Sequence, residues 1–133
     1  MAGQNGYMDA DALKAACLDL TGAEETFPFG METSVFKVCG KMFALSALDE
    51  TPLSVSLKCE PELAVQLREQ HAEIAGGWHL NKRHWNTVRL SGSLPDRMVL
   101  DMIEDSYDLV VSALPREQRT RLGWTGRRER ADG

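Results

Sequence analysis

Apolar and polar residues change their spacing along the chain, and these changes separate helical from extended segments. Between Asp9 and Gly22 the apolar residues recur three and four positions apart, which predicts a helix with one buried stripe. Extended segments follow over 33–39, 41–48 and 53–59. In the last of these, LSVSLKC, apolar residues alternate with serines and a lysine, so we expect one face to pack and the other to meet solvent or a partner.

The second half of the chain repeats this change of spacing. A second helix is predicted from Pro61 to about Glu73, a fourth strand over 86–91, and a long last helix from about 96 to Leu114. The resulting order is α-β-β-β-α-β-α. Because three consecutive strands have short connections, the sequence predicts an α+β fold with an antiparallel or mixed sheet and helices packed on one face.

The length of 133 residues and the composition are those of one globular domain. We assign this domain to residues 1–114, with residues 1–8 as a flexible arm, and expect the basic segment 115–133 to be a loosely ordered tail. The loop ETFPFG is predicted to be ordered, with the rings on either side of Pro28 packed inward. The three cysteines lie within apolar patterns without C-x-x-C spacing and are interpreted as reduced core thiols.

Composition and charge limit the classes of function. The amino terminus lacks the pattern of a secretory signal and no stretch is apolar enough to span a bilayer, which predicts a cytoplasmic protein without membrane contact. The formal net charge of −5 argues against indiscriminate nucleic-acid binding, because that affinity comes mainly from cations. However, the acid-free interval between Glu73 and Asp96 contains Lys82, Arg83 and Arg89, so a basic patch can persist on an acidic protein.

The stretch GWHLNKRHW, at 77–85, gathers two tryptophans, two histidines and a Lys-Arg pair. As a nucleic-acid surface, Lys82, Arg83 and His84 would contact phosphates while Trp78 or His79 stacks on bases or sugars. This residue combination is used by proteins that bind single strands or grooves.

The alternative for this stretch is structural, and both interpretations can apply to different residues. Trp85 would begin a strand and pack against the core, Leu80 would fill a gap, and Asn81 would hold a turn by bonding backbone amides. The histidines lie five positions apart, not the four that place two ligands on one helical face, so neither a metal site nor a cofactor is predicted. No nucleophile, phosphate-loop or dinucleotide motif occurs, which weakens an enzymatic role.

Five motifs follow one another along the chain: FPFG at 27–30, VFKVCGKMFAL at 35–45, LSVSLKCEPELAVQLR at 53–68, GWHLNKRHWNTV at 77–88 and SYDLV at 106–110. Together they resemble the MmcQ/YjbR family of small bacterial proteins, over roughly residues 9–114. The resemblance implies a compact α+β fold of the CyaY-like, double-wing kind and a DNA-binding role. It implies no catalytic residues.

Two hypotheses of function follow. The first is a non-enzymatic, monomeric DNA-binding module that contacts phosphates through Lys37, Lys58, Lys82, Arg83 and His84. The second is a module that binds a small anionic ligand or a protein partner, using the 77–85 loop and the FPFG loop, in a pocket formed by Phe29, Trp78, His79 and Lys82. A convex basic face favours the first and a concave site the second. A third hypothesis is an enzyme that uses His79 or His84 as a base.

Overall fold

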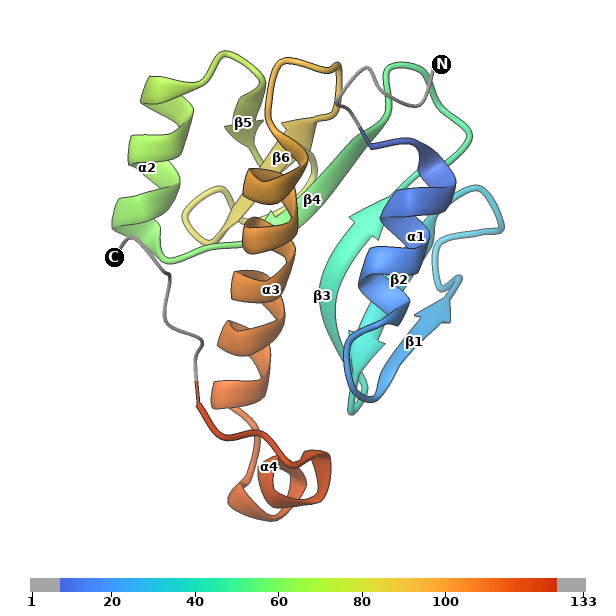
Figure 1. Cartoon of the computed structure of the whole chain (residues 1–133), viewed down its shortest axis with the longest axis vertical. Coiled ribbons are helices and arrows are strands. Elements are labelled where there is room, and N and C mark those ends of the chain that lie inside the picture. Colours follow the sequence, from blue (N-terminus) through green and yellow to red (C-terminus); the bar gives the residue numbers. More distant parts are fainter. Residues whose placement is uncertain (1–7, 127–133) are drawn as a thin grey trace.

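The computed structural model describes residues 8–126, which form a six-stranded antiparallel sheet with helices on one face (Figure 1). The strand order is β1-β2-β3-β4-β6-β5. The elements are α1 (Ala10–Leu18), β1 (Ala23–Thr26), β2 (Ser34–Val38), β3 (Lys41–Ser46), β4 (Ser54–Lys58), α2 (Pro61–Gln70), β5 (Ile74–Gly76), β6 (Trp85–Arg89), α3 (Asp96–Ser112) and α4 (Arg116–Leu122). The predicted α+β class is confirmed, and the sheet is antiparallel rather than mixed. None of the helices formed by these residues combines the length and apolarity that a bilayer crossing requires.

The two faces of the sheet are covered differently. On the helix face, Phe36, Val55 and Val88 are buried in a core shared with α1 and α3, and Figure 1 shows these two helices lying across the sheet. The opposite face, which we call the loop face, carries the residues that alternate with them. There Ser56 lies between Leu45 and Thr87 in register, so residues of β3, β4 and β6 are side by side.

A β-bulge tightens the contact between β3 and α3. The register between β2 and β3 shifts after Phe36, which leaves Phe43 as an extra residue on β3. Phe43 and Ala44 are consequently both buried, instead of pointing to opposite faces. The ring of Phe43 packs edge-on against Tyr107 of α3, with 5.5 Å between ring centroids.

Next to this bulge, Ser106 of α3 connects the helix to two strands. Its hydroxyl donates to the carbonyl oxygen of Phe43 at 2.6 Å and accepts the backbone N–H of Lys58 at 2.8 Å. The direct register of β3 and β4 includes Ala44 opposite Leu57, so Phe43 and Lys58 would be the next pair. The serine hydroxyl therefore bridges the ladder at that position.

Three elements differ from the predicted order. The short strands β1 and β5 were not predicted, and α4 occupies part of the segment expected to be a loose tail. Leu122, the last residue of α4, and Trp124 beyond it pack against the core, and the indole of Trp124 donates to Asp108 Oδ1 at 3.0 Å. The expected arm at 1–8, except for the buried Met8, and the end of the basic tail at 127–133 lie outside the described residues.

The three cysteines occupy different environments. Cys17 is fully buried, and desolvation, reinforced by the nearby Glu25 carboxylate, raises its pKa to about 12. Burial, with Asp105 as the next cause, raises the pKa of Cys59 to about 11. Cys39 lies at the turn between β2 and β3, where it has a φ of 50°. Its side chain is exposed, so its interpretation as a core thiol is wrong.

This difference predicts selective thiol chemistry. At about pH 8, an aromatic disulfide reagent should modify Cys39 of the folded protein rapidly and Cys17 and Cys59 slowly, because the thiolate is the reactive form. Unfolding should expose all three thiols. The matched variant C39S should lack the rapid phase, and a rapid phase that persists in C39S would contradict the assignment.

Candidate functional site

A hollow of about 350 Å³ lies on the loop face, between the sheet and the loops at 27–33 and 77–84. This volume is within the range of small-molecule sites. Its wall combines five apolar residues, five hydroxyl residues, one carboxylate and one imidazole: Phe29, Leu45, Ala47, Trp78 and Leu80; Thr33, Ser46, Ser54, Ser56 and Thr87; Glu50; and His79. The site is therefore concave and largely apolar, with hydrogen-bonding groups at defined positions.

The floor of the hollow is held by two hydroxyl groups on neighbouring strands. Ser56 Oγ and Thr87 Oγ1 are 2.8 Å apart and share a hydrogen bond. Thr87 Oγ1 also accepts the backbone N–H of Trp78 at 3.1 Å. Because this second bond runs from the loop to the sheet, it fixes the point at which Trp78 rises above the floor.

The 77–84 loop is built from backbone hydrogen bonds. Gly77 donates to the carbonyl of Trp85 at 2.8 Å, where the loop leaves the sheet. The side-chain oxygen of Asn81 accepts the backbone N–H of Arg83 at 2.9 Å, which confirms the predicted turn-holding role of Asn81. His79 has a φ of 61°, in the left-handed region that costs energy for a residue with a Cβ.

Exposed aromatic side chains form the rim of the hollow. Phe29 and Trp78 are 67% and 71% exposed, although each belongs to a large apolar residue type. The indole of Trp78 lies against the imidazole of His79, with 4.6 Å between ring centroids. The prediction that both rings of the FPFG loop pack inward is wrong, since Phe29 is mostly exposed and Phe27 is 38% exposed. Such exposed apolar area beside a hollow is typical of binding sites.

The structure brings together three of the four residues predicted for a ligand pocket. Phe29, Trp78 and His79 line the same hollow, whereas Lys82 is absent from its wall. The ammonium group of Lys82 instead donates to the carbonyl of Gly77 at 3.1 Å. Its cation is therefore engaged with the loop that carries it.

The residues predicted for phosphate contact have different surroundings. Arg83 lines a hollow with Glu60 and Glu62 at the start of α2. This helix accepts a hydrogen bond from Asn86, which alternates with Thr87 and so faces away from the loop face. Lys37 and Lys58 alternate with buried core residues and lie on the loop face, on strands β2 and β4, whose backbones are about 10 Å apart.

His84 is held inside its own turn. Its backbone N–H donates to Asn81 at 3.1 Å, and its carbonyl accepts from Cys59 at 2.8 Å. The side chain is half-buried. Trp85 begins β6 as predicted, but it lies opposite Lys58 on the loop face and is not among the core residues.

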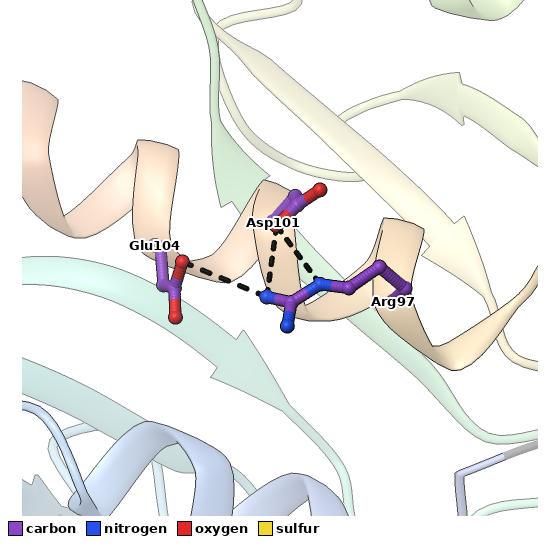
Figure 2. A network of polar contacts seen from close by, with 3 residues as sticks. All are labelled: Arg97, Asp101 and Glu104. Carbon is purple, nitrogen blue, oxygen red and sulfur yellow. Dashed lines mark hydrogen bonds and ion pairs between the residues drawn. The ribbon is translucent and has the colours of Figure 1, made fainter. Parts of the chain in front are cut away.

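The surface of α3 adds no free positive charge near its start. Figure 2 shows Arg97 between two carboxylates of the same helix. Its guanidinium contacts Asp101 Oδ1 at 2.9 Å and Glu104 Oε1 at 3.8 Å. An exposed pair four residues apart contributes only about 0.3–0.5 kcal/mol to stability, but it neutralises the arginine locally. Within residues 8–126, no group of three or more His, Cys, Asp or Glu is placed to hold a metal ion.

Several residues of the hollow had only a partial signal in the sequence. The alternation in LSVSLKC placed Ser54 and Ser56 on the polar face of a strand, and Thr87 alternates with Val88 in the same way. Glu50 lies in the turn before β4 and had no signal, because the sequence does not show which loop faces the hollow.

Comparisons with known proteins identify relatives along most of the chain. The YjbR family model matches residues 18–109. The uncharacterised protein YjbR of Escherichia coli K12 is 39% identical over 115 residues, which cover 86% of this chain and 98% of the relative. The uncharacterised protein YbdF of Escherichia coli O157:H7 is 32% identical, over 84% of this chain and 92% of the relative.

Two solved structures are also similar. The crystal structure of Deinococcus radiodurans protein DR2400, described with domain DUF419, has a TM-score of 0.85 at 39% identity and covers 95% of both chains. A Pseudomonas syringae protein has a TM-score of 0.57 at 30% identity, over 65% of this chain and 86% of that one. These names and descriptions give no activity.

Proposed function

The chain belongs to the YjbR family, and we propose that this member is a non-enzymatic binding protein that holds a small ligand in the hollow on the loop face. Its relatives are named as uncharacterised proteins, so the proposal rests on the site. A family fold by itself does not specify a function.

One observation carries the proposal. Two separate loops place Phe29 and Trp78 on the rim of one hollow, and both rings are mostly exposed to solvent. Leaving large apolar side chains in water is unfavourable, and a ligand that covers them gains the hydrophobic free energy of that area. The hydroxyl groups of Ser56 and Thr87 beneath them provide the few fixed polar contacts that orient a bound molecule.

DNA binding is the competing function, and the positions of the cations favour it less. Phosphate binding requires several lysines or arginines on one surface. Here Lys82 bonds a loop carbonyl, and Arg83 shares its hollow with two glutamates. Only Lys37 and Lys58 of the predicted set share the loop face. A ligand in a concave site requires none of these cations.

A screen of small aromatic and heterocyclic compounds by amide-shift NMR tests the proposal. We expect binders to shift the amide signals of Trp78 and Thr87. The substitution W78A should lower their affinity at least about tenfold. The variant should remain folded, since this side chain is 71% exposed. The matched control is M31A, because Met31 is similarly exposed, at 77%, but does not line the hollow.

Two results would overturn the proposal. The first is a set of binders whose shifts all lie outside the hollow, or which bind W78A as well as the parent. The second is salt-sensitive binding of labelled single- or double-stranded DNA in fluorescence anisotropy that disappears in a K82E/R83E variant. That second result would establish the DNA function instead.

A further inference from the structure

We propose that the ligand of the hollow is a small organic cation, an ammonium or amidinium group on an apolar body. The inference rests on the proposed function and adds the charge of the ligand. It reverses the expectation of an anionic ligand. Three properties of the wall support it, namely its charge, its aromatic rim and its hydroxyl floor.

The charge of the wall is negative. Glu50 is the one carboxylate that lines the hollow, and within residues 8–126 no lysine or arginine lines it. Of the predicted cations, Lys82 donates to the carbonyl of Gly77, and Lys58 lies two positions along β4 from Ser56 without lining the hollow. An anion placed here would face Glu50 without a compensating lysine or arginine, whereas a cation would pair with it. The formal net charge of −5 over the whole chain acts in the same direction.

The aromatic rim suits a cation as well. The faces of Trp and Phe rings carry partial negative charge, so they attract ammonium and guanidinium-like groups. Phe29 and Trp78 come from different loops and line one hollow of about 350 Å³. Two such rings together with a carboxylate are the combination that recognises organic cations, because apolar contact and charge attraction act on the same group.

The floor supplies acceptors for N–H groups. Ser54, Ser56 and Thr87 line the hollow. A hydroxyl oxygen has two lone pairs. Ser56 and Thr87 share one hydrogen bond and Thr87 accepts the N–H of Trp78, so this pair retains two lone pairs and one hydroxyl hydrogen for a ligand. A primary ammonium or an amidinium carries several N–H donors and no acceptor, so hydroxyl and carboxylate oxygens satisfy it. A carboxylate or phosphate ligand would instead require donors, of which the hydrogen-bonded Ser56–Thr87 pair retains one.

Three probes that share one ring test the inference by NMR titration: 2-phenylethylammonium, 2-phenylethanol and phenylacetate. We expect the ammonium probe to bind about tenfold more tightly than the alcohol, and phenylacetate to bind most weakly. In E50Q the affinity for the ammonium probe should fall about tenfold, with the alcohol unaffected. E32Q removes the same charge from a residue outside the wall and should change neither affinity.

Other outcomes separate this inference from the proposed function. Equal binding of the three probes in the hollow, or tightest binding of phenylacetate there, would overturn the inference and leave the proposed function intact. An equal loss of affinity for the ammonium probe in E32Q and E50Q would overturn the inference too, because the total charge of the protein would then explain the effect. Failure of the ammonium probe to shift Trp78 and Thr87 would also overturn it, and the compound screen would decide the proposed function separately.

Discussion

Replacing Ser106 with alanine is expected to lower the free energy of unfolding by about 2–6 kcal/mol. Ser106 is fully buried, and its hydroxyl joins α3 to β3 and β4 at once. Alanine fits the space but leaves the N–H of Lys58 and the carbonyl of Phe43 without this partner. Each buried polar group that loses its hydrogen bond costs about 1–3 kcal/mol, and two are affected.

Urea unfolding followed by circular dichroism measures this loss. The matched control is S112A, the same substitution in the same helix, because Ser112 donates only to the carbonyl of Leu109 within its own helix. We expect S112A to change stability by less than about 0.5 kcal/mol. Equal stability of S106A and S112A, with unchanged dependence on urea, would show that the Ser106 bridge contributes little.

The helices and strands that could be predicted from the sequence have regular apolar spacing, whereas the elements that were not predicted lack it. The strand β1, with the sequence AEET, offers no alternation to recognise. It is held by polar contacts instead, since Glu25 pairs with Lys14 at 3.2 Å and accepts the hydroxyl of Ser34 at 2.6 Å. The helix α4 similarly has no buried residue of its own, and Trp124 beyond it contacts Asp108. Contacts between distant residues specify these elements, and single-sequence periodicity does not show them.

The same distinction applies to the site. Ser56 follows from strand alternation, and Trp78 and His79 from an unusual local cluster. The direction of the Lys82 side chain could not be predicted from the sequence. It depends on the carbonyl of Gly77, five residues earlier, which the loop brings within hydrogen-bond distance of the ammonium group. Likewise, Glu50 enters the hollow from a separate turn. The sequence thus indicated which residue types gather here. The charge of the wall could be read only from the folded structure, which shows that Glu50 lines the hollow and that Lys82 does not.

Replacing Gly77 with alanine is expected to abolish detectable binding in the hollow and to lower the free energy of unfolding by about 1–3 kcal/mol. A Cβ at this position would lie 2.7 Å from the Cβ of Trp85 and 3.1 Å from its carbonyl oxygen. The Cβ of Leu80, which lines the hollow, would be at 3.2 Å. These atoms belong to the strand and the loop, so backbone must move to relieve the contact.

That movement acts directly on the rim, because Trp78 and His79 follow Gly77 in the chain and Gly77 bonds the carbonyl of Trp85 where the loop leaves the sheet. The control is G76A, whose Cβ would meet the aliphatic stem of Lys82, an exposed side chain that can turn aside. Unfolding curves and amide-shift titrations with 2-phenylethylammonium compare both variants at a temperature where each is folded. If G77A matched the parent in stability and affinity, the prediction would be wrong, and the close packing of Gly77 on Trp85 would not determine the position of Trp78 and His79. If G76A lost as much as G77A, the loop would depend on Lys82 instead.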